Sequence, residues 1–109
     1  MIQKQLGQTQ TGAGTETTIY TVPSNTEASN LILTCCNVTA SADTIQVYQD
    51  DNGASSTSAE ALYFDLPIAA KATLKLAIGP MSTATGTIRV SSATANAVTF
   101  TLHGMERIR

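Results

Sequence analysis

The feature that most restricts the fold of this chain is a two-residue alternation of apolar and polar side chains, in short runs separated by turn-forming residues. In residues 73–78, for example, Leu74, Leu76 and Ile78 alternate with small or polar residues. Alternation of this kind is typical of strands with one buried face, because successive strand side chains point to opposite sides of the sheet. No segment longer than a turn or two has helical periodicity. We therefore expect an all-β chain, and 109 residues suit a single domain.

Seven runs of this kind are bounded by turn residues at the spacing of an antiparallel sandwich or barrel. The predicted strands are residues 17–22, 28–39, 44–49, 61–66, 73–78, 86–92 and 98–103. The run 28–39 is fairly apolar on both faces, so it is expected to be central and covered on both sides. In the run 61–66, Leu62, Phe64 and Leu66 share one face. The pattern predicts an antiparallel β-sandwich of about seven to eight strands, jelly-roll-like or immunoglobulin-like.

Both ends of the chain are candidates for contact with a partner. Residues 1–16 are rich in Gln, Thr and Gly, and are expected to form an extended N-terminal arm before a single β-sandwich domain at residues 17–109. A frayed terminus is the alternative. The last four residues combine two arginines with an apolar side chain, which suits docking on an acidic neighbour and equally suits a solvated tail. The candidate partner-docking residues are Ile2, Leu6, Arg107, Ile108 and Arg109.

Charged side chains are scarce in this chain. Only 13% of the residues are charged, whereas Thr, Ala and Ser together supply 42 of the 109. A free domain normally keeps itself soluble with a dense surface of mixed charges, so this composition predicts a surface partly covered by neighbouring subunits. Aromatic residues make up 5% and Trp is absent, so the core is expected to consist mainly of Leu, Ile, Val and Ala. Oligomerisation would supplement so thin a core.

The few charges are segregated along the sequence. Residues 1–65 hold seven acids and one base, and residues 66–109 hold five bases and one acid. Complementary halves can meet across two subunits or within one sandwich, and we favour the second arrangement. The net charge of −2 argues against nucleic-acid binding. The first ten residues contain no continuous apolar run, so neither a signal peptide nor a membrane anchor is expected there.

Cysteine and histidine give no catalytic pattern. Cys35 and Cys36 are adjacent, so on a strand they point to opposite faces and cannot form a relaxed disulfide. We expect one buried and one outward thiol. His103 is the only histidine, and neither a nucleophile elbow nor a metal-ligand spacing accompanies it. It is expected to be an ordinary surface or interface side chain, and the chain is expected to be neither an enzyme nor a cofactor-binding protein.

Two further groups of side chains are candidates for binding. The cluster Asp50-Asp51-Asn52-Gly53 offers oxygen ligands to Ca²⁺, with Asp43 or Glu60 as additions. It lacks the ligand spacing of an EF-hand, so a hairpin turn is the preferred interpretation. The three tyrosines offer a stacking platform for a sugar, but we favour rings packed at the rim of the sandwich with their hydroxyls in water. They are Tyr20, Tyr48 and Tyr63.

A set of short segments, in a fixed order over most of the chain, carries a family resemblance. The segments are Leu6-Gly7-Gln8, Ile19-Tyr20-Thr21-Val22-Pro23, Cys36-Asn37, Tyr63 with Asp65, Pro67-Ile68-Ala69-Ala70, Thr73-Leu74, Gly79, and Val98 through Phe100 to Gly104. In their order and spacing the chain resembles a family of small phage virion proteins, which are β-sandwich accessory structural proteins. The resemblance implies a part of a virion and no catalytic residues.

These observations together predict a bacteriophage virion structural protein, most directly a capsid decoration or cement protein that binds and stabilises the head shell. The expected partners are further copies of the chain, as a trimer or dimer, and the major capsid protein, with no nucleic acid and no membrane. The expected location is the outer surface of the phage head, after synthesis in the host cytoplasm. The alternative is a tail or tail-fibre accessory protein that contributes to recognition of the host surface.

Overall fold

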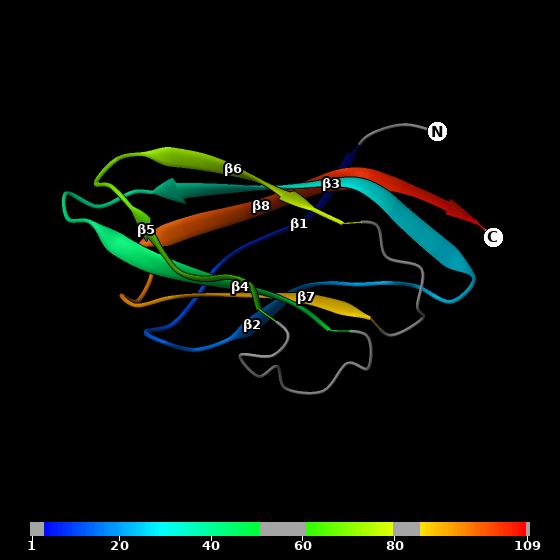
Figure 1. The fold of residues 1–109 in the computed structure, drawn as a ribbon, viewed down its shortest axis with the longest axis horizontal. Helices are drawn as coiled ribbons and strands as arrows, with labels where there is room; N and C mark the ends of the chain where they lie inside the picture. Colours follow the sequence, from blue (N-terminus) through cyan, green and yellow to red (C-terminus); the bar gives the residue numbers. More distant parts are fainter. Residues whose placement is uncertain (1–3, 51–60, 80–85, 109) are drawn as a thin grey trace.

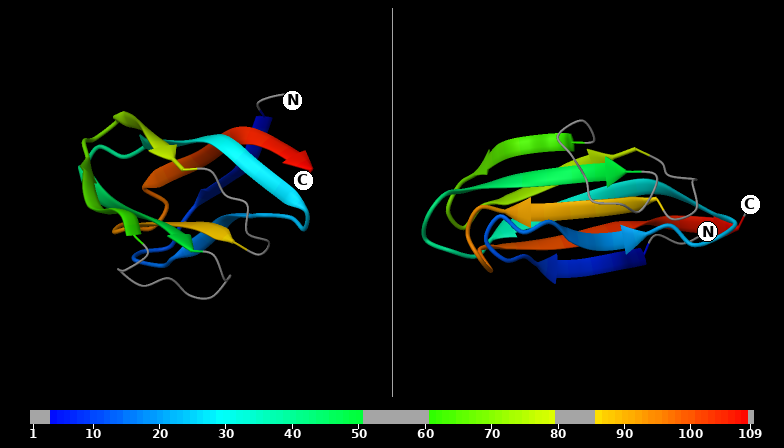
Figure 2. Two further views of the ribbon diagram at one scale, coloured as in Figure 1. Left: turned by 45° about the vertical axis from the view of Figure 1, so that its right-hand side comes forward. Right: turned by 90° about the horizontal axis from the view of Figure 1, so that it is seen from below.

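The computed structural model describes residues 4–50, 61–79 and 86–108, and every regular element in these ranges is a β-strand (Figure 1). The strands are β1 (Lys4–Gln10), β2 (Thr17–Thr21), β3 (Thr26–Asn37), β4 (Asp43–Asp50), β5 (Ala61–Ile68), β6 (Thr73–Ile78), β7 (Thr87–Ser92) and β8 (Val98–Ile108). They form two antiparallel sheets that pack face to face, which confirms the predicted all-β sandwich (Figure 2).

The strand order identifies the sandwich as a jelly roll. The first sheet has the order β1-β8-β3-β6, and the second sheet has the order β2-β7-β4-β5. The pairs β1·β8, β2·β7, β3·β6 and β4·β5 are all antiparallel, as in one long hairpin whose successive strand pairs alternate between the sheets. This is the eight-stranded double Greek key of a jelly roll. An immunoglobulin sandwich keeps its first two strands in one sheet, whereas here β1 and β2 lie in different sheets.

The described part of the N-terminal segment belongs to the sandwich. Residues 4–10 form β1, which pairs along its length with β8. Leu6 packs against the core instead of projecting toward a neighbour. The prediction of an N-terminal arm over residues 1–16 is therefore wrong for residues 4–10, and the sandwich includes strand residues before position 17. The sequence hides this strand, because its seven residues contain one large apolar side chain and it is held mainly by backbone pairing.

The core lies between the two sheets, where their inward side chains meet. Burial of each large aliphatic or aromatic side chain there stabilises the fold by about 1.5–3 kcal/mol. The fully buried apolar side chains include Val22, Leu31, Leu33, Ile45, Val47, Ile68, Ile88, Val90, Val98, Phe100 and Leu102. They are aliphatic apart from one phenylalanine, as the composition predicts.

Strand β5 departs from the predicted alternation. Leu66 packs against the core, but Leu62 and Phe64 are 42% and 52% exposed. The cause is irregular pairing with β4, because the register shifts twice within β5. The first shift is a β-bulge at Phe64 and Asp65, where Asp65 has a φ of 52°, and the second is at Leu62. One extra residue moves the side chains on one side of a bulge to the opposite face of the strand. The prediction that Leu62, Phe64 and Leu66 share one face is wrong for this reason.

Strands β3 and β8 are the longest, and their paired ends extend past the other strands of the first sheet (Figure 1). Strand β3 is central, between β8 and β6, as expected. The expected cover over its second face is not found in the described part of the chain, since Ile32 on the outer side is 40% exposed. The outer faces of the two sheets are therefore the surfaces that the fold presents to a partner.

Candidate binding surfaces

The outer face of the first sheet is regular and nearly uncharged, and we call it the neutral face. Its side chains stand in three rows, each crossing β1, β8, β3 and β6 in that order. The rows are Gln10–Thr99–Cys36–Thr73, Gln8–Thr101–Thr34–Lys75 and Gln5–His103–Ile32–Ala77. Within these rows, Lys75 is the one side chain with a formal charge.

Hydrogen bonds between side chains join β1 to β8 on the neutral face. The Nε2 atom of Gln8 donates to Oγ1 of Thr101, and Nε2 of Gln10 donates to Oγ1 of Thr99, each at 2.9 Å. The long amides of β1 therefore lie over β8 instead of extending outward. Methyl, hydroxyl and amide groups share this surface, so a neutral partner can cover it without removing many charges from water.

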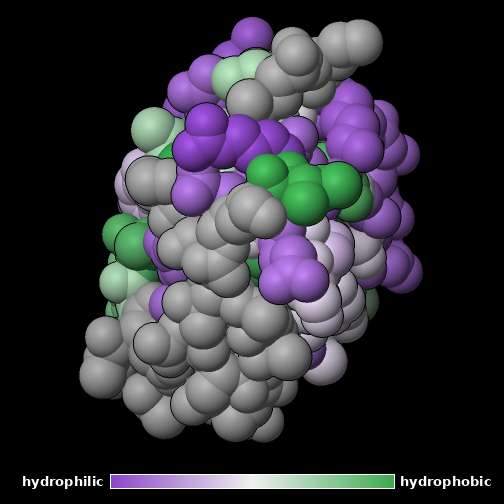
Figure 3. Space-filling model, turned by 90° about the vertical axis from the view of Figure 1, so that its right-hand side faces the viewer, coloured by the Kyte–Doolittle hydropathy of each residue, from purple (hydrophilic) through white to green (hydrophobic). Residues whose placement is uncertain are grey.

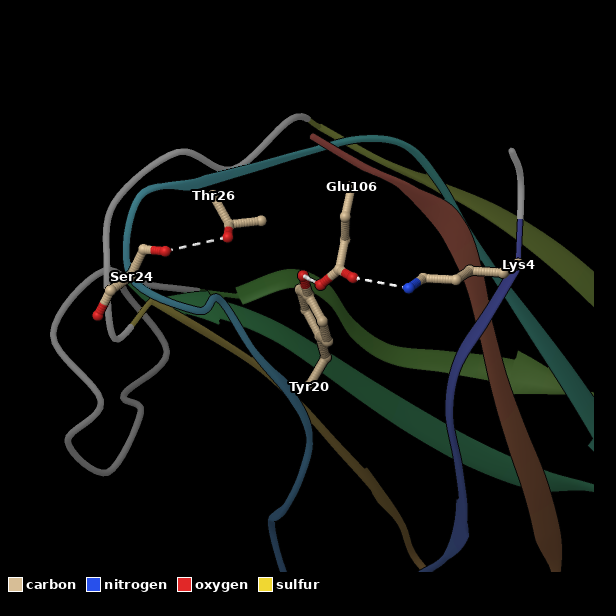
Figure 4. Close-up of polar contacts among 5 residues, drawn as sticks. All are labelled: Lys4, Tyr20, Ser24, Thr26 and Glu106. Carbon is tan, nitrogen blue, oxygen red and sulfur yellow. Dashed lines mark hydrogen bonds and ion pairs between the residues drawn. The ribbon is translucent and has the colours of Figure 1, made fainter. Parts of the chain in front are cut away.

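A polar cluster closes the sandwich at the end where β1 begins. The Tyr20 hydroxyl donates to Oε2 of Glu106 at 2.5 Å, and Nζ of Lys4 lies 3.1 Å from Oε1 of the same carboxylate (Figure 4). Tyr20 is on β2 and Glu106 is on β8, so the hydrogen bond joins the two sheets. The hydrogen bond from Tyr20 outweighs burial and lowers the pKa of Glu106. Burial and then the carboxylate of Glu106 raise the pKa of Tyr20, which keeps the phenol a donor.

The paired ends of β3 and β8, beyond this cluster, carry the C-terminal candidate residues. The NH2 group of Arg107 lies 2.7 Å from Oε1 of Glu27, on the neighbouring strand. Ile108 is 84% exposed. Seen from this end, the molecule has small apolar areas set within a hydrophilic surface (Figure 3). Of the other candidate docking residues, Ile2 and Arg109 lie outside the described residues.

The outer face of the second sheet holds a shallow pocket of about 260 Å³, which we call the polar pocket. The Nε2 atom of Gln46 donates to Oδ1 of Asp65 at 2.8 Å, and Oε1 of Gln46 accepts from the hydroxyls of Tyr48 at 2.6 Å and Ser91 at 3.3 Å. Burial, and then the carboxylates of Glu16 and Asp65, raise the pKa of Tyr48. The lining residues are Gly14, Thr44, Gln46, Asp65, Ser91, Ser92 and Ala93.

The cysteines and the histidine lie where the strand pattern predicts. Cys35 is buried and Cys36 is half-buried on the neutral face, and both thiols are free. The prediction of one inward and one outward thiol is confirmed. Burial raises the pKa of the Cys35 thiol to about 12. His103 is half-buried and shares the neutral face with Thr99 and Thr101.

The tyrosines do not form a common platform. Tyr20 and Tyr48 are buried, and the hydroxyl of each donates to a side chain of the protein. Tyr63 packs against the core, and its hydroxyl donates to the carbonyl oxygen of Ala77 at 3.1 Å, which links β5 to β6. The packed rings are confirmed, but all three hydroxyls bond to protein groups. A sugar-stacking surface made of these three rings is therefore excluded.

The candidate calcium ligands are only partly described. The side chains of the Asp50-Asp51-Asn52-Gly53 cluster and of Glu60 lie outside the described part of the chain. Asp43 is buried, and its carboxylate accepts the backbone N–H groups of Thr44 and Thr94. Among the described residues, no group of three or more His, Cys, Asp or Glu side chains could hold a metal ion.

Opposite charges from the two halves of the sequence meet within the chain. Each ion pair among the described residues joins a residue before position 66 to one after it. The pairs are Lys4–Glu106, Glu16–Arg89 and Glu27–Arg107. The intramolecular alternative, in which early acids meet late bases within one sandwich, is therefore confirmed for Glu16 with Arg89 and for Glu27 with Arg107. Lys71 and Lys75 are exposed and have no ion pair in the described ranges.

No protein-family model matches the chain, and no curated protein matches it either. In the part of the chain that the structure describes, no helix is long and apolar enough to cross a membrane. Function must therefore be inferred from the jelly roll and its two outer faces.

Proposed function

We propose that this protein is a bacteriophage virion structural protein, specifically a capsid decoration or cement protein that binds and stabilises the assembled head shell. The observation that carries the proposal is the neutral face, which is four strands wide and has one charged side chain. A free domain normally has a dense charged surface, so a face of this kind suits cover by a neighbour. Jelly rolls occur in viral shells, among other roles. The resemblance to small phage virion proteins supports the same assignment.

The size of the neutral face limits how tightly one copy can bind. Strand and residue spacings give a face of about 20 Å by 20 Å, or about 400 Å². A standard specific interface buries about 800 Å² on each partner, so one face supplies about half of that area. Stable attachment then requires several faces acting together. The proposed assembly is a trimer or dimer of this chain on the major capsid protein, where linked contacts strengthen one another.

The proposed action is binding and involves no turnover. A protein that binds the assembled shell but not its separated subunits stabilises the shell by mass action. Contacts of the neutral face use methyl, hydroxyl and amide groups, which mobile ions screen little. The reinforcement is therefore expected to persist over a wide range of salt concentration.

A charge placed at the centre of the neutral face tests this proposal. Thr101→Arg adds a cation to the middle row, whereas Thr21→Arg adds the same charge at an exposed position of β2 in the second sheet. On particles that lack the protein, we expect Thr101→Arg to lower occupancy about tenfold, equivalent to about 1.4 kcal/mol, because the guanidinium would be buried without a partner. Thr21→Arg should match the unchanged protein. Equal occupancy by both variants would contradict docking through this face.

A tail or tail-fibre accessory protein is the second candidate function. The polar pocket favours it, since a component that meets the host surface needs a site for polar host groups. Immunogold labelling of intact particles separates the two candidates. Label on the heads supports decoration, and label confined to the tails rejects it.

A further inference from the structure

The sandwich is closed along one side and open along the other. Strands β1 and β2 end the two sheets on the closed side, where a Cβ atom on Gly7 would lie 2.2 Å from the backbone oxygen of Ile19. Strands β5 and β6 end the sheets on the opposite side (Figure 2). We call β5, β6 and the turn between them, residues 69–72, the open side. Among the described residues, five apolar side chains are packed on the core but only partly buried, and four of them lie on the open side: Tyr63, Leu66, Ala72 and Leu74.

Strand β5 adds two exposed apolar side chains to the open side. Leu62 and Phe64 are 42% and 52% exposed. An exposed apolar edge strand is a common site of association with another chain. A complete β-ladder with a further strand is not available, because Pro67 has no N–H group and the bulge at Phe64 and Asp65 interrupts the strand. Side chains must therefore carry the contact on this side.

The open side also holds one unpaired charge of each sign on its two strands. Asp65 is exposed on β5 at the outer face of the second sheet, and Lys75 is exposed on β6 at the outer face of the first sheet. Neither forms an ion pair with a described residue. They stand on opposite faces of a sandwich whose sheets are about 10 Å apart, so they do not pair within one copy.

The two charges lie at nearly the same level along the strands. Strand β5 continues for three residues after Asp65, and β6 begins two residues before Lys75. At about 3.3 Å per residue, Asp65 is about 10 Å and Lys75 about 7 Å from the turn that joins the strands. By the same count Phe64 is level with Ala77. The hydrogen bond from the Tyr63 hydroxyl to the carbonyl oxygen of Ala77 supports this alignment.

We propose that the open side binds the open side of a second copy of this chain, in a dimer whose two-fold axis runs parallel to the strands. Rotation about this axis brings β5 of one copy beside β6 of the other and leaves each level along the strands unchanged. Asp65 then lies beside the partner's Lys75 on a shared outer surface, and the symmetry forms this ion pair twice. Phe64 packs on the small side chain of the partner's Ala77, which leaves room for the ring.

The charges select this axis over the other arrangement that joins the same two sides. A two-fold axis perpendicular to the sheets would place β5 beside β5 and β6 beside β6. Asp65 would then face the partner's Asp65, and Lys75 would face the partner's Lys75. Like charges opposite each other on neighbouring strands are destabilising. The axis parallel to the strands instead gives every one of these charges an opposite neighbour.

The size of the open side predicts a reversible dimer. Strand β5 has 8 residues and is about 26 Å long, and the sandwich with its side chains is about 20 Å thick, so each copy buries about 500 Å². A standard interface buries about 800 Å² on each partner, and we expect a Kd of about 20 µM.

The dimer does not depend on attachment to a shell, so it can form even if the proposed function is wrong. If the proposed function holds, the neutral face of one copy and the outer face of the partner's second sheet lie side by side. The surface turned toward the shell is then about twice as wide as one neutral face.

Sedimentation equilibrium of the full-length chain measures the dimer and the part played by the charges. We expect Lys75→Glu to weaken dimerisation at least tenfold, because two ion pairs become two contacts between like charges. Addition of Asp65→Lys to this variant should return the Kd to within about threefold of that of the unchanged protein. A lysine can hold the backbone conformation of Asp65, since Lys71 has a φ of 60°. An increase in NaCl from about 0.05 M to about 0.5 M should weaken the unchanged dimer about fivefold.

Further variants separate the open side from the other surfaces. Phe64→Ala should weaken dimerisation about tenfold, because it removes the largest exposed apolar side chain of β5. Ile108→Ala removes an even more exposed apolar side chain at the end of β8 and should leave the Kd unchanged. Thr101→Arg, at the centre of the neutral face, should also leave it unchanged. Circular dichroism spectra show whether each variant is folded.

Cysteine cross-linking identifies the axis. Asp65→Cys and Lys75→Cys are prepared separately, each combined with Cys36→Ser to remove the outward thiol of the chain. Neighbouring strands place facing Cα atoms about 5 Å apart, within the range of a disulfide. Under mild oxidation the mixed variants should form a linked dimer that contains one copy of each, as mass spectrometry shows. Each variant alone should stay unlinked.

Three results would overturn this dimer. The first is a chain that remains monomeric at about 500 µM in low salt. The second is self-association that Lys75→Glu and Phe64→Ala leave unchanged but Thr101→Arg abolishes, which would place the contact on the neutral face. The third is cross-linking of Asp65→Cys with itself and not with Lys75→Cys, which would show the axis perpendicular to the sheets.

Discussion

Substitution of Gly7 by alanine measures how firmly the N-terminal strand belongs to the sandwich. A Cβ atom at this position would lie 2.2 Å from the backbone oxygen of Ile19 and 3.0 Å from its Cγ1 atom. The oxygen is part of the backbone of β2, so β1 and β2 must separate by about 1 Å to restore normal contact. Such overpacking costs about 3 kcal/mol, and the better strand-forming tendency of alanine returns about 1 kcal/mol. We expect Gly7→Ala to lower the free energy of unfolding by about 2 kcal/mol.

The assay is urea denaturation followed by circular dichroism, with Gly79→Ala as the control. A Cβ atom at Gly79 meets nothing within 4 Å, so this variant should stay within about 0.5 kcal/mol of the unchanged protein. For a two-state domain of this size, the loss in Gly7→Ala corresponds to a fall in Tm of about 10 °C. If residues 1–16 formed an arm outside the sandwich, both variants would be silent. Equal unfolding midpoints for the two variants would refute the placement of β1.

Two further predictions concern single groups whose pKa values the fold changes. The folded pKa of Glu106 lies below its ordinary value, so ionised Glu106 adds stability above the ordinary pKa, and this contribution is lost as pH falls through the lowered value. Tyr20→Phe removes the hydrogen bond that is the main cause of the lowered pKa of Glu106. Near pH 7 we expect this variant to lower the free energy of unfolding by about 1.5–3 kcal/mol, and we expect the difference from the unchanged protein to become smaller in acid. Urea denaturation near pH 7 and in acid measures the two differences. For the cysteines, iodoacetamide at about pH 8 should label Cys36 and leave Cys35 unmodified until the protein unfolds, because burial raises the pKa of Cys35 to about 12. Mass spectrometry of the digested protein shows which of the two cysteines is labelled. Equal labelling of both thiols in the folded state would contradict the burial of Cys35.

The strands that the sequence predicts correctly are those in which alternation coincides with burial. Residues 73–78 form β6, and residues 98–103 fall within β8, with the expected side chains inward. Strand β1 lacks this alternation, because it lies at a sheet edge and Leu6 is its one large apolar side chain, which packs against the core. Its partner is far away in sequence, as the bond between Gln8 and Thr101 across 93 positions illustrates. A local pattern contains no information about such a partner.

The candidate sites depend on register, which the local pattern also leaves open. Gln46 and Asp65 are 19 positions apart, and they meet because a bulge inserts one residue into β5. A two-residue repeat assumes an unbroken strand, so it places Phe64 on the wrong face. The side chains of Thr99 and Thr101 are predicted outward correctly. Their position beside the glutamines of β1 follows only from the jelly-roll order of the strands.

The jelly roll gives the segregation of charge along the sequence a physical explanation. In this topology the early strands lie beside the late strands, so acids early in the chain and bases late in the chain are brought together. Glu16 thus meets Arg89 beside the β2·β7 pair, and Glu27 meets Arg107 across β3 and β8. Charges paired within the chain are less available to neighbours, and the face left for contact consists of methyl, hydroxyl and amide groups. Association through that face should change little with salt, whereas strongly salt-dependent attachment would place the contact at exposed cations such as Lys71.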